Sequence, residues 1–175
     1  FFTYSEFSQD KFRKLLKSEP PIVPVGIKIP QKVYVKPNNK SFNILLVGRV
    51  VGWKSFFWQS IKYLKTTSFD YKLHIIGDGI EMKSLKDYIK LNLNENNVNF
   101  YGNVPTQKML DIAVTMDIAV SVGTSAVILS SMGLPTVIGI ENSDRSILLN
   151  YGFFSNIKGY TFNEKEAKLK KSSFN

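Results

Sequence analysis

The sequence predicts an α/β domain built on a doubly wound parallel sheet. Short apolar runs alternate with amphipathic segments between residues 42 and 140, and most of these runs end at glycine. Continuous apolar runs are typical of strands that are buried on both faces of a parallel sheet. Five strands alternating with four helices in about a hundred residues require right-handed crossovers, with helices on both faces. The expected architecture is therefore Rossmann-like.

The expected strands and helices follow one another in a regular order. Apolar runs predict strands at residues 42–47, 73–76, 98–101, 117–122 and 136–140. Apolar residues three, four and seven positions apart predict helices at 54–64, 82–89 and 106–116, the last with Thr106 as its N-cap. A further helix is expected at 125–132. The uncharged stretch 118–140 is long enough to cross a bilayer, but its many Gly, Pro, Ser and Thr residues favour a buried strand, helix and strand.

Both ends of the chain carry weaker signals. Residues 1–40 are interpreted as the end of a preceding domain and a Pro-rich interdomain linker, with a helix at 4–17 capped at Ser8. Residues 41–175 are interpreted as the Rossmann-like domain, ending in a short strand at 159–162 and a charged helix at 163–171. The chain opens without Met or a leader signature, so we expect it to be a segment of a longer protein.

Composition excludes several function classes. The 175 residues are 43% apolar, with 13 Phe, 8 Tyr and 2 Trp, enough to bury a core. The absence of Cys excludes disulfides, thiolate zinc sites and a cysteine nucleophile. The single histidine, His74, lies inside a predicted strand and is interpreted as a packed residue rather than a catalyst.

The net charge of +9 is compatible with nucleic acid, an anionic membrane surface or an anionic small ligand. A solvated lysine-rich surface is the plainer alternative. Only three of the 23 cations are Arg, and Arg dominates base readout, so we expect no nucleic-acid partner. Trp53, Phe56, Phe57 and Trp58 cannot all face inward on one helix, so the excess is expected to face another domain or a membrane surface. A peripheral membrane contact is thus a further expectation.

Ligands of open parallel sheets bind beyond the carboxyl ends of the strands, so the loops that follow the strands are the candidate sites. The first loop, Gly48–Ser55, has three residues between its glycines, and Trp53 precedes the lysine. It therefore matches neither the phosphate loop of nucleotide hydrolases nor a dinucleotide fingerprint. Arg49 and Lys54 remain as a cationic pair, each able to make charge-assisted hydrogen bonds to phosphate worth about 1.5–3 kcal/mol. Two surface cations beside a turn are the alternative.

Two further loops follow predicted strands. Gly77-Asp78-Gly79 indicates either a close backbone approach or a plain turn. Gly123-Thr124-Ser125 enters a helix whose N–H groups and dipole attract anions, although N-capping by Thr124 or Ser125 explains it equally well. Together the three loops indicate an anionic ligand with a polar or sugar-like remainder.

The order of these motifs resembles one enzyme family. ILLVGRVVGWK, LHIIGDG, VNFYGNVP and MDIAVSVGTSAVILSSMGLPTVIG follow one another across about residues 43–139. This series is similar to the C-terminal, donor-binding domain of GT-B glycosyltransferases, in particular the group-four-like retaining enzymes of bacterial polysaccharide synthesis. The resemblance implies one half of a GT-B fold that binds a nucleotide-diphosphate sugar.

The resemblance also implies a reaction and its partners. A hexosyltransferase of this family moves a sugar to a growing glycan, such as a capsule, or to a lipid-linked acceptor, with retention, in the cytoplasm or at the cytoplasmic face of the membrane. It uses no metal and no other cofactor, since Arg, Lys and a helix terminus supply the positive field. A missing N-terminal domain binds the acceptor, so this segment alone is expected to bind the donor without turnover.

The resemblance also assigns site residues, because the matching motifs place the family's binding positions on particular residues of this sequence. The resemblance implies that Arg49, Lys54 and the turn at Gly123, Thr124 and Ser125 contact the diphosphate. The turn at Asp78 and Gly79 and the loop at Asn103 and Val104 would flank the nucleoside. No catalytic residue of this segment is assigned.

One position departs from the family pattern. The family carries a Glu in the helix after the Gly-Thr-Ser turn, where it binds the ribose hydroxyls, and Ile128 occupies that position here. An aliphatic side chain accepts no hydrogen bond, so nucleotide affinity is expected to fall or to be reorganised through Ser130 or Ser131. A non-catalytic domain of polysaccharide assembly and a non-hydrolysing sugar-nucleotide epimerase remain as alternatives.

Overall fold

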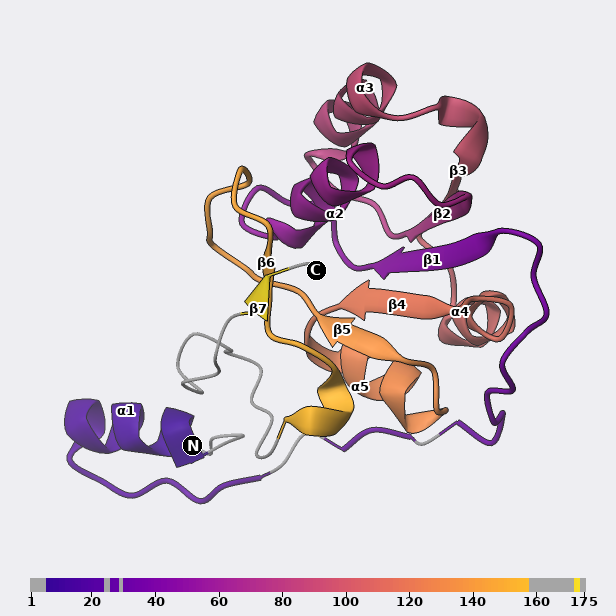
Figure 1. The fold of residues 1–175 in the computed structure, drawn as a ribbon. Helices are drawn as coiled ribbons and strands as arrows, with labels where there is room; N and C mark the ends of the chain where they lie inside the picture. Colours follow the sequence, from indigo (N-terminus) through magenta and orange to yellow (C-terminus); the bar gives the residue numbers. More distant parts are fainter. Residues whose placement is uncertain (1–5, 24–25, 29, 158–171, 174–175) are drawn as a thin grey trace.

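The computed structural model describes residues 6–23, 26–28, 30–157 and 172–173. Its centre is a five-stranded parallel sheet (Figure 1) in the order β3-β2-β1-β4-β5. The strands are β1 (Phe42–Val47), β2 (Tyr71–Ile76), β3 (Val98–Gly102), β4 (Ile118–Ser121) and β5 (Thr136–Ile138). The doubly wound sheet predicted from the sequence is confirmed.

Helices cover both faces of the sheet (Figure 1). One face carries α2 (Phe56–Lys65) and α3 (Met82–Asn92), and the other carries α4 (Thr106–Ala113) and α5 (Gly123–Ser131). The remaining elements are α1 (Glu6–Leu16), the 3-10 helices η1 (Glu95–Asn97) and η2 (Phe154–Asn156), and the strand pair β6 (Leu149–Asn150) and β7 (Ser172–Ser173). The chain leaves β1 for one face and β4 for the other, so the loops after these two neighbouring strands diverge.

Alternation along the strands builds two cores. In β1, Ile44 and Leu46 pack toward α2 and α3, whereas Leu45 and Val47 pack toward α4 and α5. Successive strand residues point to opposite faces, so a strand covered on both sides is apolar at most of its positions. This explains why the strands read as continuous apolar runs.

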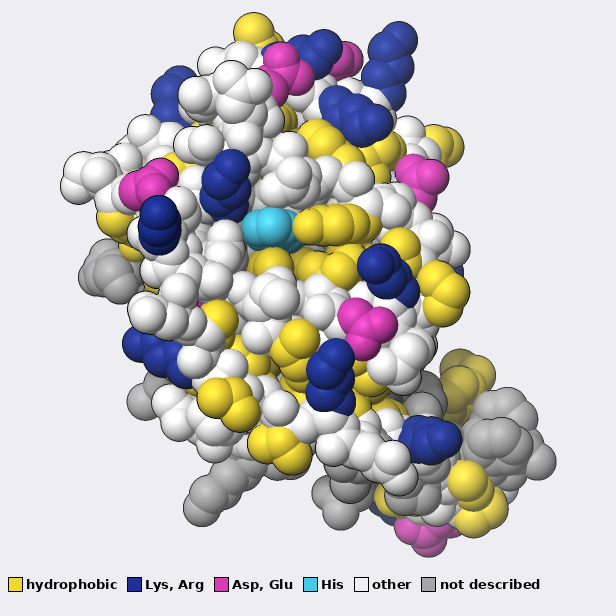
Figure 2. All heavy atoms as spheres, turned by 90° about the vertical axis from the view of Figure 1, so that its right-hand side faces the viewer, with side chains coloured by type: hydrophobic (Ala, Val, Ile, Leu, Met, Phe, Trp, Pro, Cys, Tyr) yellow, Lys and Arg dark blue, Asp and Glu magenta, His cyan; other side chains and the backbone are white. Residues whose placement is uncertain are grey.

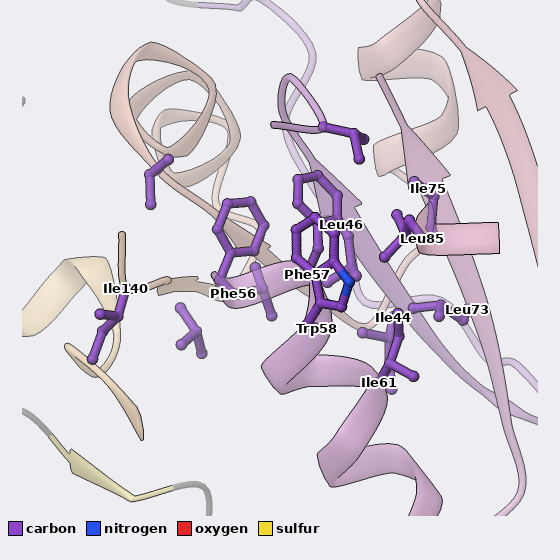
Figure 3. Close-up of a cluster of buried hydrophobic side chains, with 14 of the residues drawn as sticks. Ile44, Leu46, Phe56, Phe57, Trp58, Ile61, Leu73, Ile75, Leu85 and Ile140 are labelled. Atoms are coloured by element: carbon purple, nitrogen blue, oxygen red, sulfur yellow. The ribbon is translucent and has the colours of Figure 1, made fainter. Parts of the chain in front are cut away.

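Helix α2 is buried more completely than its sequence suggests. Phe56, Phe57 and Trp58 all lie in the core (Figure 3), with the rings of Phe56 and Phe57 stacked at 4.4 Å. The premise that these aromatic residues cannot all face inward is wrong for the three on the helix, whereas Trp53, before the helix, is exposed. The reason is that the segment after β5 packs against α2 and brings Ile140 and Tyr151 into the same cluster. Contact of the excess, now Trp53 alone, with another domain or a membrane stays a prediction.

Helix starts differ from the predicted caps. Helix α1 begins at Glu6, so Ser8 lies inside it and is not its N-cap. Pro105, not Thr106, is the N-cap of α4, and its φ of −59° and ψ of 152° turn the chain into the helix without a side-chain hydrogen bond. The predicted strand at 159–162 and helix at 163–171 lie outside the described residues.

Residues 30–41, the end of the Pro-rich linker, form neither helix nor strand and dock on the domain; we call them the connector. The Tyr34 N–H donates to the Met132 carbonyl at 2.7 Å, and Lys32 Nζ pairs with Asp111 Oδ1 at 2.9 Å. Further along, Asn39 Nδ2 donates to the Thr115 carbonyl and to Asp117 Oδ2, both at 3.0 Å. These bonds fix the path by which the chain enters β1. The division of the chain at residue 40 stays a prediction.

The uncharged stretch 118–140 forms β4, α5 and β5, as its small residues predict. Within the ranges that the structure describes, no helix is both long and apolar enough to cross a membrane.

His74 is a packed residue of β2, as expected. Its Nδ1 lies 2.9 Å from Tyr101 Oη and its Nε2 lies 3.4 Å from Asn43 Oδ1, and its ring stacks on that of Tyr101. Burial, followed by the nearby positive charge of Lys72, lowers the pKa of His74 below its ordinary 6.5.

We expect the stability of the domain to fall in mildly acidic solution because of this histidine. Above pH 6.5 the ring is neutral whether the chain is folded or unfolded, and as the pH drops toward the lower folded pKa only the unfolded chain takes up the proton. The free energy of unfolding, measured with urea at about pH 7.5 and about pH 5.5, should therefore decrease. His74→Gln keeps a polar side chain without the titration and should show a smaller decrease. An equal decrease in both proteins would assign the effect to other groups.

Candidate functional site

The loops after β1 and β2 are joined by close backbone contacts. Gly77 has φ +131°, and a Cβ there would lie 1.9 Å from the Gly48 carbonyl oxygen. The Val50 N–H donates to the Asp78 carbonyl at 2.9 Å, and the Glu81 N–H donates to the Val50 carbonyl at 3.1 Å. Gly79 is equally confined, since its Cβ would meet the Val50 carbonyl oxygen at 2.2 Å. The glycines of the second loop therefore allow a close backbone approach.

A cavity of about 420 Å³ opens at the carboxyl ends of the strands, where the loops after β1 and β4 diverge. This strand-end cavity is lined by residues from the ends of β1 and β2, the loop after β3, α4 and α5: Val47, Gly48, Arg49, Ile76, Gly77, Asp78, Asn103, Val104, Thr106, Met109, Thr124, Ser125 and Ile128. Such a switch point is where open parallel sheets bind ligands.

The cavity brings together most of the residues singled out in the sequence. Its lining includes six of them: Arg49, Asp78, Asn103, Val104, Thr124 and Ser125. Three others, Lys54, Gly79 and Gly123, do not line it. Gly79 instead packs against the backbone of Val50, and Gly123, at φ +63°, is the first residue of α5.

The positive side of the cavity comes from Arg49 and from the start of α5. Within the described residues Arg49 is exposed and forms no ion pair. The N-cap of α5 is Val122, which has no side-chain oxygen, so the alternative of N-capping by Thr124 or Ser125 is wrong. Both residues lie inside the first turn, where the helix dipole is positive. On the opposite side, Asp78 Oδ1 accepts a hydrogen bond from the Gly79 N–H at 2.7 Å.

Lys54 lies beside the cavity and is paired. Its Nζ is 3.8 Å from Glu141 Oε1 and 5.3 Å from the centre of the Trp53 ring. A Cβ on Gly48 would lie 3.5 Å from the same Nζ, so the ammonium group sits next to the end of β1. No local pattern in the sequence points to Glu141, because the carboxylate comes from a loop far along the chain.

That loop, residues 141–146, is held on α2 by polar side chains. Ser55 Oγ donates to the Ser143 carbonyl at 2.7 Å and accepts from its N–H at 3.0 Å. Gln59 Nε2 donates to Ser143 Oγ at 2.9 Å and to the Asp144 carbonyl at 3.0 Å. The guanidinium of Arg145 lies 3.6 Å from the centre of the Trp58 ring and donates to the Gly52 carbonyl at 3.1 Å. These contacts fix the loop that carries Glu141 to its place next to Lys54.

Ile128 lines the strand-end cavity, so an aliphatic side chain occupies the place where the resemblance implies a ribose-binding carboxylate. Ser130 and Ser131 line a different cavity, together with Leu134 and Phe153, and Ser131 Oγ donates to the Ile128 carbonyl at 2.8 Å. The expectation that one of these serines replaces the carboxylate is therefore wrong. They lie too far along α5 to face the strand ends.

Metal ligands do not gather in the described part of the chain. No three His, Asp or Glu side chains there converge on a point that could hold an ion. Independence from metals stays a prediction.

Comparison with known proteins gives no match among protein-family models and none among curated sequences. Solved structures do match. A sucrose-phosphate synthase from Thermosynechococcus elongatus superposes with a TM-score of 0.65 at 14% identity, over 78% of this chain and 39% of that one. The apo form of the lipopolysaccharide outer core galactosyltransferase WaaB superposes with a TM-score of 0.63 at 20% identity, over 78% of this chain and 42% of that one.

A third match is a point mutant of TarM from S. aureus, solved with fondaparinux, α-GlcNAc-glycerol and UDP, with a TM-score of 0.61 at 17% identity. It covers 78% of this chain and 29% of that one, so the chain spans less than half the length of each of these three structures. The chain therefore has the Rossmann-like fold found in GT-B glycosyltransferases, and its cavity lies at the switch point of that fold.

Proposed function

We propose that the chain is the donor-binding domain of a glycosyltransferase that transfers a hexose from a nucleotide-diphosphate sugar to a glycan or lipid-linked acceptor. The observation that carries this proposal is the strand-end cavity, which combines Arg49, the first turn of α5 and the loops at Asp78 and Asn103. Transfer with retention, independence from metals and a cytoplasmic location are parts of the same proposal.

The charges around the cavity suit a diphosphate next to a polar nucleoside. Arg49 presents a planar cation that binds phosphate through two hydrogen bonds, and the first turn of α5 adds N–H groups. Asp78 and Asn103 line the same cavity with polar groups suited to sugar hydroxyls or a base. Similar structures support the nucleotide: TarM was solved with UDP, and so was the pneumococcal O-GlcNAc transferase GtfA.

The proposed chemistry of this domain is stabilisation of the leaving group. When the bond between the sugar and the diphosphate breaks, negative charge grows on the departing phosphate. Arg49, Lys54 and the α5 dipole would face that charge from fixed positions, which is the most effective way for a protein to stabilise it. A second domain would supply the acceptor site.

Calorimetric titration of the chain with UDP, GDP and ADP tests the proposal. We expect one nucleotide to bind and so to identify the base of the donor. If the chain is folded by circular dichroism and none of the three binds at millimolar concentration, the proposal fails.

Ile128 favours a second candidate, a non-catalytic domain of a polysaccharide-assembly protein. An aliphatic residue in the cavity leaves ribose hydroxyls without a carboxylate partner from α5. Ile128→Glu separates the two candidates, because it should strengthen nucleotide binding in a working donor site and should not create binding in a chain that has lost the site.

Glu141→Gln is expected to raise the affinity for UDP about two- to tenfold, because it removes a negative charge that attracts Lys54 away from a phosphate. Titrations at low and high salt check the electrostatic origin, since the gain should shrink as salt screens it. Glu95→Gln, in an exposed pair with Lys90 at 3.9 Å, is the matched control and should change nothing. A lower affinity in Glu141→Gln would mean that Glu141 holds Lys54 in its binding position.

A further inference from the structure

The side of the domain where the strands begin carries exposed apolar residues. Val33 and Val35 are 74% and 77% exposed, and Phe42 and Phe69 are 41% and 43% exposed. Figure 2 looks onto this side and shows hydrophobic side chains lying between lysine and arginine side chains. We call the set the basic apolar edge: Val33, Val35, Lys36, Lys40, Phe42, Lys65, Phe69 and Lys72. None of these residues lines the strand-end cavity.

The aromatic part of this edge is preformed. The Phe42 and Phe69 rings meet edge to face at 5.8 Å, and Phe69 meets Tyr71 in the same manner at 6.1 Å. A cavity of about 560 Å³ runs beside these rings and is lined by residues 36–42, Phe69, Asp70 and Asp117. Rings held against one another lose little further freedom when a partner covers them.

The connector holds the aliphatic part in place. Tyr34 bonds to the Met132 carbonyl through its N–H and packs on the α4 and α5 core. Because side chains of an extended chain alternate, the inward side chain of Tyr34 places Val33 and Val35 outward. The docked path of the connector thus exposes two valines that a free linker would not fix.

The charges on this edge are mostly positive. Lys36, Lys40, Lys65 and Lys72 are all exposed, and among the described residues none of them pairs with an acidic side chain. The acidic groups beside the aromatic cavity are engaged within the protein. Asp70 Oδ2 accepts from Ser41 Oγ at 2.7 Å, and Asp117 Oδ2 accepts from the Asn43 N–H at 2.8 Å.

We propose that the basic apolar edge docks the protein on an anionic phospholipid surface. Aromatic rings and aliphatic side chains enter the boundary between headgroups and acyl chains, while lysines around them bind anionic headgroups. Excess positive charge over the whole chain, +9, acts in the same direction at longer range. The strand-end cavity lies at the other end of the strands and stays open to water, so the membrane and a nucleotide bind independently.

Co-sedimentation of the chain with vesicles tests this proposal. Vesicles of phosphatidylcholine mixed with phosphatidylglycerol should retain the protein, and vesicles of phosphatidylcholine alone should not. Lys36→Gln and Lys40→Gln should each weaken partitioning about fivefold. Val33→Ser combined with Val35→Ser should weaken it about tenfold, because two exposed aliphatic groups are lost.

Matched controls lie near the opposite end of the strands. Ile80→Ser removes a side chain that is 91% exposed, and Lys83→Gln removes an exposed lysine at the start of α3. Neither change should affect partitioning. Equal losses in the controls would show adsorption by overall charge and overturn the proposal, as would absence of binding to the anionic vesicles, which would leave an acidic protein as the partner. Nucleotide titration of the same variants reports on the donor site separately, so either proposal can fail alone.

Discussion

Arg49→Ala is expected to weaken binding of UDP, or of whichever nucleotide the chain prefers, about 10- to 100-fold. Arg49 is the one cationic side chain in the lining of the strand-end cavity, within the part of the chain that the structure describes. A charge-assisted hydrogen bond contributes about 1.5–3 kcal/mol, which corresponds to this range of dissociation constants. Calorimetric titration of both proteins at one salt concentration measures the change.

Lys72→Ala is the matched control for Arg49→Ala. It removes the same charge from an exposed position near the start of β2, at the other end of the strands. It should leave the affinity within about twofold, because charges beyond about 10 Å are screened at ordinary salt. Equal weakening by both substitutions would show that the nucleotide responds to net charge and that Arg49 does not contact it.

Gly77→Ala is expected to destabilise the domain by about 2–6 kcal/mol. The positive φ of +131° costs about 1–3 kcal/mol for a residue with a side chain, and the added Cβ, 1.9 Å from the Gly48 carbonyl oxygen, forces apart two backbones for about as much again. Total stabilities of small domains are about 5–15 kcal/mol, so the loss is a large share. Urea unfolding followed by circular dichroism measures it.

Gly102→Ala separates the two causes. Gly102 also has a positive φ, +65°, but in the described part of the chain no atom lies within 4 Å of its added Cβ. The substitution Gly102→Ala should therefore lower the free energy of unfolding only by the conformational cost, about 1–2 kcal/mol. If Gly77→Ala costs no more than Gly102→Ala, the close contact between the first two loops is not the feature that confines Gly77.

The sequence determined the elements of the fold. The five apolar runs became the five strands, because strands covered on both faces are mostly apolar; the few polar strand residues, such as Ser121 and Thr136, are buried and hydrogen-bonded. The predicted helices at 54–64 and 125–132 appear as α2 and α5 with their starts moved by two residues, since caps depend on local backbone that a periodic pattern does not report. The loops that line the cavity were also predicted, because all parallel strands point the same way and so their ends must meet.

Only the tertiary structure decided which side chains share a site. Arg49 and Ser125 line the cavity and Lys54 does not, although the sequence presented Arg49 and Lys54 alike. The difference comes from Glu141, which the loop after β5 brings to Lys54, and from bonds such as that between Ser55 and Ser143, 88 residues apart. The same loop buries one side of α2. Contacts of this range depend on how segments pack, and no local pattern in the chain encodes them.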